Sequence, residues 1–166
     1  MTEKYLNSAL SAEERAKDLL SKMSLAEKLG QVQCFGRAQM GKRKADDLFP
    51  HGFGQVSNLI AVAMPTEQAV AKMVNEDQRL AMRLSDHHIP ALFHIESLSG
   101  PLVANSTTFP SGIGQASTWD PVLEEEVGKV IGKQSRAVGM RQVCAPVLDV
   151  THDPRFGRDG RRVANC

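Results

Sequence analysis

The polar residues of this chain that could do chemistry gather after two short apolar segments. His94 and Glu96 are separated by one residue, so a β-strand would place both side chains on the same face of a sheet. A second group follows a later apolar segment and comprises Asp149, His152, Asp153, Arg155 and Arg158. An ionised carboxylate only accepts hydrogen bonds, and a guanidinium only donates them. Carboxylates and arginines in these places therefore suit a ligand that is rich in hydroxyl groups.

The segment that begins at His94 partly matches two catalytic motifs, but each motif needs further residues that this sequence does not have. A zinc deaminase pairs His-x-Glu with a downstream Pro-Cys-x-x-Cys, which this sequence lacks. A nucleophile elbow needs glycine two residues before its serine, but Ile95 precedes Ser97 and Ser97 precedes Ser99 at that distance. Structural roles stay open for both groups. The polar pair could be bonded to nearby loops, and the aspartate before Pro154 could cap a turn.

The composition excludes several classes of protein. The 166 residues carry 20 Lys and Arg against 19 Asp and Glu, a net charge of +1, so we expect no nucleic-acid partner despite the arginine-rich segment 155–162. Cys34, Cys144 and Cys166 are scattered, which predicts neither disulfides nor a metal site and favours a cytoplasmic location. No signal-peptide pattern is visible, and no apolar run reaches the roughly 20 residues that span a bilayer, so we expect no membrane partner.

The N-terminal part of the chain predicts two helices in tandem. Ser11 with Glu14, and Ser24 with Glu27, each have the spacing of a capping box. Apolar residues recur at helical spacing after the first box, which predicts a helix over 12–22, and the second box opens a short helix that runs toward Gln33. We expect residues 1–35 to form a helical lead-in to the rest of the chain.

From residue 52 onward the sequence alternates between strand and helix patterns. Strands are predicted over 54–60, 91–95 and 142–150, and helices over 65–84 and 118–138. The order β-α-β-α-β with long crossover helices is typical of a parallel sheet in the α/β class. Ligands bind beyond the carboxyl ends of such strands. The candidate site is therefore made of the segments that follow the strands, namely 61–64, 96–100 and 149–158.

Four segments, in order, resemble those of glycoside hydrolase family 3. They are the opening at 12–33, Ile-Pro-Ala-Leu-Phe-His-Ile-Glu-Ser-Leu-Ser-Gly at 89–100, the stretch 107–121 with Thr-Trp-Asp-Pro, and Ala-Pro-Val-Leu-Asp-Val-Thr-His-Asp-Pro-Arg-Phe-Gly-Arg at 145–158. The resemblance implies a (β/α)8 TIM barrel of which this chain supplies about the first three strands. Residues 1–166 would then be the N-terminal portion of one barrel domain, and 159–166 a tail that does not fit the family pattern.

The resemblance also implies a function. It implies an enzyme that hydrolyses O-glycosyl bonds in β-glycosides, of the β-glucosidase or β-xylosidase type, with retention and without a cofactor. The substrate would be a β-linked oligosaccharide or an aryl glycoside, and Glu96 and Arg158 would bind hydroxyls of its first sugar. The family's nucleophile and acid/base have no counterpart in this sequence, which implies a truncated chain that is inactive alone. The alternative is a non-catalytic sugar-binding fragment or the degenerate product of a truncated gene.

Overall fold

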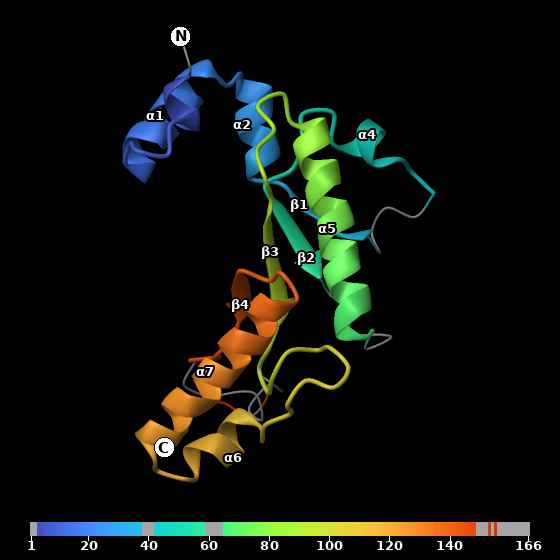
Figure 1. Ribbon diagram of the computed structural model, residues 1–166. Helices are drawn as coiled ribbons and strands as arrows, with labels where there is room; N and C mark the ends of the chain where they lie inside the picture. The colour runs from blue at the N-terminus through green and yellow to red at the C-terminus, as the bar shows by residue number, and fades with distance from the viewer. Residues whose placement is uncertain (1–2, 38–41, 59–64, 149–152, 154, 156–166) are drawn as a thin grey trace. The chain divides into compact units, whose positions relative to one another are not determined.

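The computed structural model describes residues 3–37, 42–58, 65–148, 153 and 155. The elements follow one another along the chain as η1 (Lys4–Leu6), α1 (Ala12–Lys22), α2 (Leu25–Gln31), β1 (Cys34–Phe35), α4 (Ala45–Leu48), β2 (Gln55–Asn58), α5 (Glu67–Leu84), β3 (Leu92–Glu96), α6 (Gly112–Ala116), α7 (Pro121–Ala137) and β4 (Gln142–Cys144) (Figure 1). Strands and helices alternate from β2 to β4, which confirms the predicted α/β class. Within the described residues, no helix combines the length and the apolar character needed to cross a membrane.

The described residues fall into two compact units. One is drawn from Met1–Gln55 and Arg79–Ala91, and the other from Val56–Gln78 and Leu92–Cys166. The strands follow the order β1-β2-β3-β4 in the sheet. In the first unit, the main-chain N–H of Gln55 at the start of β2 donates to the carbonyl of Gln33, just before β1, over 3.2 Å. In the second unit, β4 pairs with β3 in parallel.

Both predicted capping boxes are present in the first unit. The hydroxyl of Ser11 accepts the N–H of Glu14 over 3.3 Å, and the Glu14 carboxylate accepts the N–H of Ser11 over 3.0 Å. Ser24 and Glu27 exchange the same two bonds at the start of α2. These bonds satisfy main-chain donors that a helix leaves free at its first turn. The serines therefore set where α1 and α2 begin, as the sequence predicted.

Three phenylalanine rings pack against one another in the first unit. The rings of Phe35 and Phe53 stack with their centroids 4.7 Å apart, and each side chain is 1% exposed. Phe49 meets both rings edge-on, at 5.6 and 5.3 Å.

A close approach at Gly54 also shapes this unit. A Cβ at Gly54 would lie 1.8 Å from the carbonyl oxygen of Gln31, so only glycine allows the chain to pass this close to the end of α2.

The second unit buries apolar side chains from both a helix and a strand. Val70 and Val74 of α5 are 0% and 6% exposed, and Phe93 and Ile95 of β3 are 2% and 1% exposed. Gly139 follows α7 with φ +89°, and a Cβ there would lie 2.7 Å from Cγ1 of Val74. The turn that ends α7 therefore packs directly against α5, and it needs glycine both for its backbone angle and for space.

Several elements differ from the sequence prediction. The two-residue strand β1 is too short to show alternation, and α4 was not predicted. Residues 105–114 are rich in Ser, Thr, Gly and Pro, which predicts a loop, whereas the short helix α6 begins within this segment at Gly112. The third predicted strand, 142–150, is regular only as far as Cys144, because Pro146 has no N–H to give to a sheet. The ends of two predicted strands, at 59–60 and 149–150, lie outside the described residues.

Candidate functional site

Glu96 ends β3 and stands at the carboxyl end of the strand. Burial alternates along β3, since Phe93 and Ile95 are buried whereas His94 and Glu96 are half-buried. The prediction that His94 and Glu96 share one face of a strand is confirmed by this alternation. The face that carries them is polar and partly open, at the end of the sheet where α/β enzymes collect their ligand-binding groups.

Cys144 joins the same face from the neighbouring strand. The parallel register places Cys144 opposite Glu96, and Gln142 opposite His94. The Sγ atom of Cys144 lies 3.8 Å from Nδ1 of His94, within hydrogen-bonding distance for sulfur. Burial, and then the negative charge of Glu96, raise the pKa of the Cys144 thiol above its ordinary value of 9.0, so the thiol is protonated at neutral pH.

Cys144 is not among the residues that the sequence pattern predicts for the site. Cysteine spacing along the chain tests for disulfides and zinc ligands, and Cys144 has no cysteine near it in sequence. Cys144 lies fifty positions after His94 in the chain, and the register between β3 and β4 brings the two side chains together. The available signal was the two-residue spacing of Gln142 and Cys144 within a predicted strand, because residues with this spacing share one face.

The segment after Glu96 is fixed by close main-chain packing. Ser97 is fully buried, and among the described residues its hydroxyl has no hydrogen-bond partner. Gly100 adopts φ +107°, and a Cβ at this position would lie 2.1 Å from the carbonyl oxygen of Thr107. The strand on one side and this tight turn on the other therefore hold the main chain of Glu96 in place.

The second predicted group is described only in part. Arg158 lies outside the described residues, as do Asp149 and His152. The Asp153 carboxylate accepts the main-chain N–H of Arg155 over 2.9 Å and forms an ion pair with the same residue's guanidinium. That guanidinium lowers the pKa of Asp153. Asp153 therefore caps a main-chain N–H close to it in the chain, in agreement with the structural alternative that the sequence left open for it.

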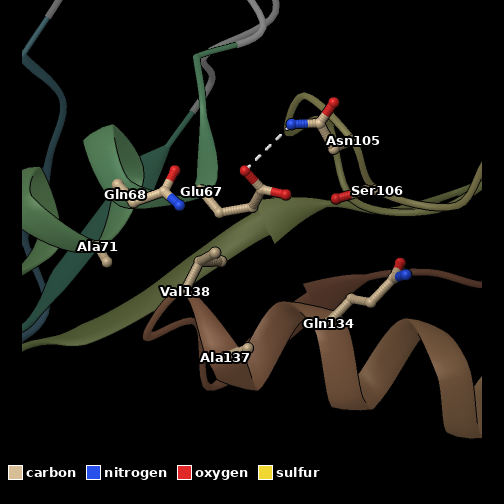
Figure 2. Close-up of a pocket in the computed structure, with 8 residues that line it drawn as sticks. All are labelled: Glu67, Gln68, Ala71, Asn105, Ser106, Gln134, Ala137 and Val138. Atoms are coloured by element: carbon tan, nitrogen blue, oxygen red, sulfur yellow. Dashed lines mark hydrogen bonds between the residues drawn. The ribbon is translucent and has the colours of Figure 1, made fainter.

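A separate hollow of about 380 Å³ lies in the second unit between α5, α7 and the loop after β3 (Figure 2). It is lined by Glu67, Gln68, Ala71, Asn105, Ser106, Gln134, Ala137 and Val138. The carboxylate of Glu67 accepts a hydrogen bond from the Asn105 amide over 3.3 Å, and the Gln134 amide is bonded to Thr107. Several of its polar groups thus hold the loop in place, and none of them is among the residues predicted for the site.

The polar face formed by His94, Glu96 and Cys144 is the candidate site. Its carboxylate can accept hydrogen bonds from two neighbouring hydroxyl groups, and its imidazole can donate or accept one. Among the described residues, no three His, Cys, Asp or Glu side chains are grouped in a way that could hold a metal ion. The chemistry that these groups support best is recognition of a polyhydroxylated ligand.

Parallel strands joined by crossover helices define an α/β protein. Residues 24–163 match the family model described as the N-terminal domain of glycosyl hydrolase family 3. The chain belongs to this family, and the resemblance carried by the four sequence segments is confirmed.

Individual relatives agree with this assignment. A β-xylosidase candidate from Formosa agariphila is 33% identical over 93% of this chain, and a periplasmic β-glucosidase from Salmonella typhimurium is 31% identical over 85%. The solved structure of a β-glucosidase from Erythrobacter marinus superposes with a TM-score of 0.85 over 98% of this chain, at 28% identity. The chain covers 21%, 17% and 22% of these three proteins, about a fifth of their length. Its architecture is that of a partial (β/α)8 barrel.

Proposed function

We propose that this chain contributes the first-sugar binding site of a retaining β-glycosidase of the β-glucosidase or β-xylosidase type. Membership of family 3, together with relatives that carry these two names, supports this activity. The observation that carries the proposal is the position of Glu96, a half-buried carboxylate at the carboxyl end of β3. Arg158 is the second proposed ligand of the sugar, on the resemblance of its segment alone.

The proposed role of Glu96 follows from its chemistry. An ionised carboxylate accepts hydrogen bonds from two adjacent hydroxyls, and each charged bond contributes on the order of 1.5–3 kcal/mol. Hydroxyl contacts of this kind tighten as the sugar ring distorts toward the transition state. Replacing Glu96 should therefore lower turnover as well as binding.

We further propose that the 166-residue chain alone does not hydrolyse glycosides. Retaining hydrolysis needs two carboxyl groups about 5–5.5 Å apart, one as nucleophile and one as acid/base. The register partner of Glu96 is Cys144, a thiol, and the nearest residue of β3 on the same face is His94, an imidazole. Incubating the purified chain with p-nitrophenyl β-glucoside and β-xyloside should release no nitrophenol above a Glu96→Ala control. Release above that control would overturn the proposal of inactivity.

Sugar binding by the chain can be measured without turnover. Saturation-transfer NMR with methyl β-glucoside and methyl β-xyloside should show contacts that Glu96→Gln abolishes. Glu67→Gln is the matched control, because it makes the same change at the carboxylate of the hollow between α5 and α7. Loss of contacts in Glu67→Gln but not in Glu96→Gln would assign the sugar to that hollow instead.

The catalytic consequence is tested in a polypeptide that continues this chain to the length of its relatives. There, Glu96→Gln should lower kcat/KM by roughly 10²-fold or more, at about 1.4 kcal/mol per tenfold, while the unfolding temperature stays close to that of the parent. Efficiency within about threefold of the parent, together with a lower unfolding temperature, would show that Glu96 is structural.

A further inference from the structure

We propose that Cys144 and His94 form a two-ligand binding site for a soft monovalent metal ion, of the chemical class of Cu⁺ and Ag⁺. The two side chains come from neighbouring parallel strands and lie on the same half-buried face of the sheet. Their ligand atoms, Sγ and Nδ1, are 3.8 Å apart. The proposed metal site shares its polar face with Glu96, but it requires only this pair of side chains and no bound sugar.

The distance between the two ligand atoms fits an ion placed between them. With the bond lengths of zinc as a guide, about 2.3 Å to thiolate sulfur and about 2.0 Å to imidazole nitrogen, a fully linear arrangement spans about 4.3 Å. The observed 3.8 Å is shorter by about half an ångström. A small rotation of either side chain would close that difference, and a bent arrangement would need less.

The chemistry of the pair selects for soft ions. Thiolate sulfur favours Cu⁺ over hard cations, and a neutral imidazole nitrogen is a suitable second ligand. Binding breaks the S–H bond and forms an S–metal bond, the proton passes to buffer, and His94 supplies a lone pair from Nδ1. Neither the metal nor the protein changes oxidation state. The negative charge of Glu96, opposite Cys144 in the register, further favours a cation at this position.

The same geometry disfavours zinc. Structural Zn²⁺ is held by four ligands in a tetrahedral arrangement, whereas Cu⁺ and Ag⁺ accept two. The part of the chain that the structure describes holds no group of three potential metal ligands. We therefore expect the site to discriminate between ions by the number of ligands it offers as well as by their softness.

The test uses the whole 166-residue chain with Cys34→Ser and Cys166→Ser, so that Cys144 is its remaining thiol. Calorimetric titration with silver nitrate in chloride-free buffer should show one high-affinity Ag⁺ ion per chain. Cys144→Ser should abolish this binding, and His94→Gln should weaken it about tenfold or more, because an intramolecular second ligand is lost. Zinc sulfate should give no binding of comparable affinity. Circular dichroism of each variant establishes that it is folded.

A second measurement needs no substitution at the site. In the same chain with ¹⁵N-labelled histidine, one equivalent of Ag⁺ should shift the ring nitrogens of His94 and leave the other histidines unchanged. Equal Ag⁺ affinity in the parent and His94→Gln, or an unshifted His94 ring at saturation, would overturn the two-ligand site in favour of a simple thiol adduct. Zinc binding as tight as silver binding would overturn the selectivity.

Discussion

The imidazole Nε2 of His87 lies 3.4 Å from the carboxylate Oε1 of Glu27, and the two side chains are only 19% and 10% exposed. The other oxygen of Glu27 accepts the main-chain N–H of Ser24 over 2.7 Å. The ring of Tyr5 meets that of His87 edge-on, with centroids 6.0 Å apart. The glutamate that caps α2 therefore also ties this helix to the segment that follows α5 in the first unit.

Two substitutions at Glu27 separate its two roles. Glu27→Gln keeps an oxygen that can accept the Ser24 N–H but removes the charge that faces His87, whereas Glu27→Ala removes both. We expect the alanine variant to lose about 1 kcal/mol more of the free energy of unfolding than the glutamine variant, the typical contribution of a cap. Urea denaturation measures both values. Equal losses would mean that the cap contributes nothing.

The same carboxyl group predicts how stability depends on pH. Hydrogen bonds from Ser24, and then the charges of His87 and His51, hold the pKa of Glu27 below its ordinary value of 4.5. A pKa that is lower in the folded state gives stability that is present above the unfolded value and is lost as pH falls through the folded value. The free energy of unfolding should therefore fall below about pH 4.5, and less steeply in Glu27→Gln.

Part of that acid sensitivity should survive in Glu27→Gln. The pKa of Asp18 is lowered chiefly by its hydrogen bond from Lys22, and that of Asp46 by its hydrogen bond from Arg83. The pKa values of both carboxyls are lowered, like that of Glu27, so protonating these groups also lowers the free energy of unfolding at low pH. Identical pH profiles for the parent and Glu27→Gln would show that carboxyl groups other than Glu27 govern the acid limb.

Local signals predicted the elements that local interactions determine. The spacing of Ser11 and Glu14 is sufficient to begin α1, because a capping box is satisfied within four residues. By contrast, β1 has two residues and exists only because neighbouring chain segments pair with it. The short helix α6 begins at Gly112, where intrinsic propensity disfavours helix, so packing rather than propensity forms it.

The candidate site also has one part that local spacing predicts and one part that depends on packing between strands. The shared face of His94 and Glu96 follows from the twofold period of a strand, which the sequence displays. The approach of Cys144 depends on the register between β3 and β4, and a shift of one residue would turn its thiol to the opposite face. Register is set by packing over the whole sheet, so spacing along the chain could not reveal it.

The contact between β3 and β4 predicts the reactivity of the Cys144 thiol. The charge of Glu96 contributes to the raised pKa of this thiol, after burial as the larger cause. Glu96→Gln should therefore lower the midpoint of the pH profile for alkylation by iodoacetamide, because thiolate is the reacting form. The shift should be partial, since burial remains. The measurement again needs Cys34→Ser and Cys166→Ser, and Glu67→Gln should leave the midpoint where it is in that parent.

Glycines at and just beyond the C-terminal part of α7 give a matched pair of substitutions with opposite expected signs. At Gly132, inside the helix, an added Cβ would meet no atom within 4 Å. At Gly139, just beyond it, the backbone has φ +89° and a Cβ would lie 2.7 Å from Cγ1 of Val74. Gly132→Ala should stabilise the chain by about 0.5–1 kcal/mol, because alanine loses less conformational freedom in a helix.

Gly139→Ala should instead destabilise the chain, by about 1 kcal/mol from the left-handed backbone alone and by more from the contact with Val74. Adding Val74→Ala to Gly139→Ala separates these two causes, because it removes the Cγ1 atom while the strained angle stays. If the steric cause is real, Gly139→Ala will cost less in the Val74→Ala background than in the parent, when both are compared by urea denaturation. Equal costs in the two backgrounds would assign the whole effect to the backbone, and a stabilising Gly139→Ala would contradict the close packing of α7 on α5.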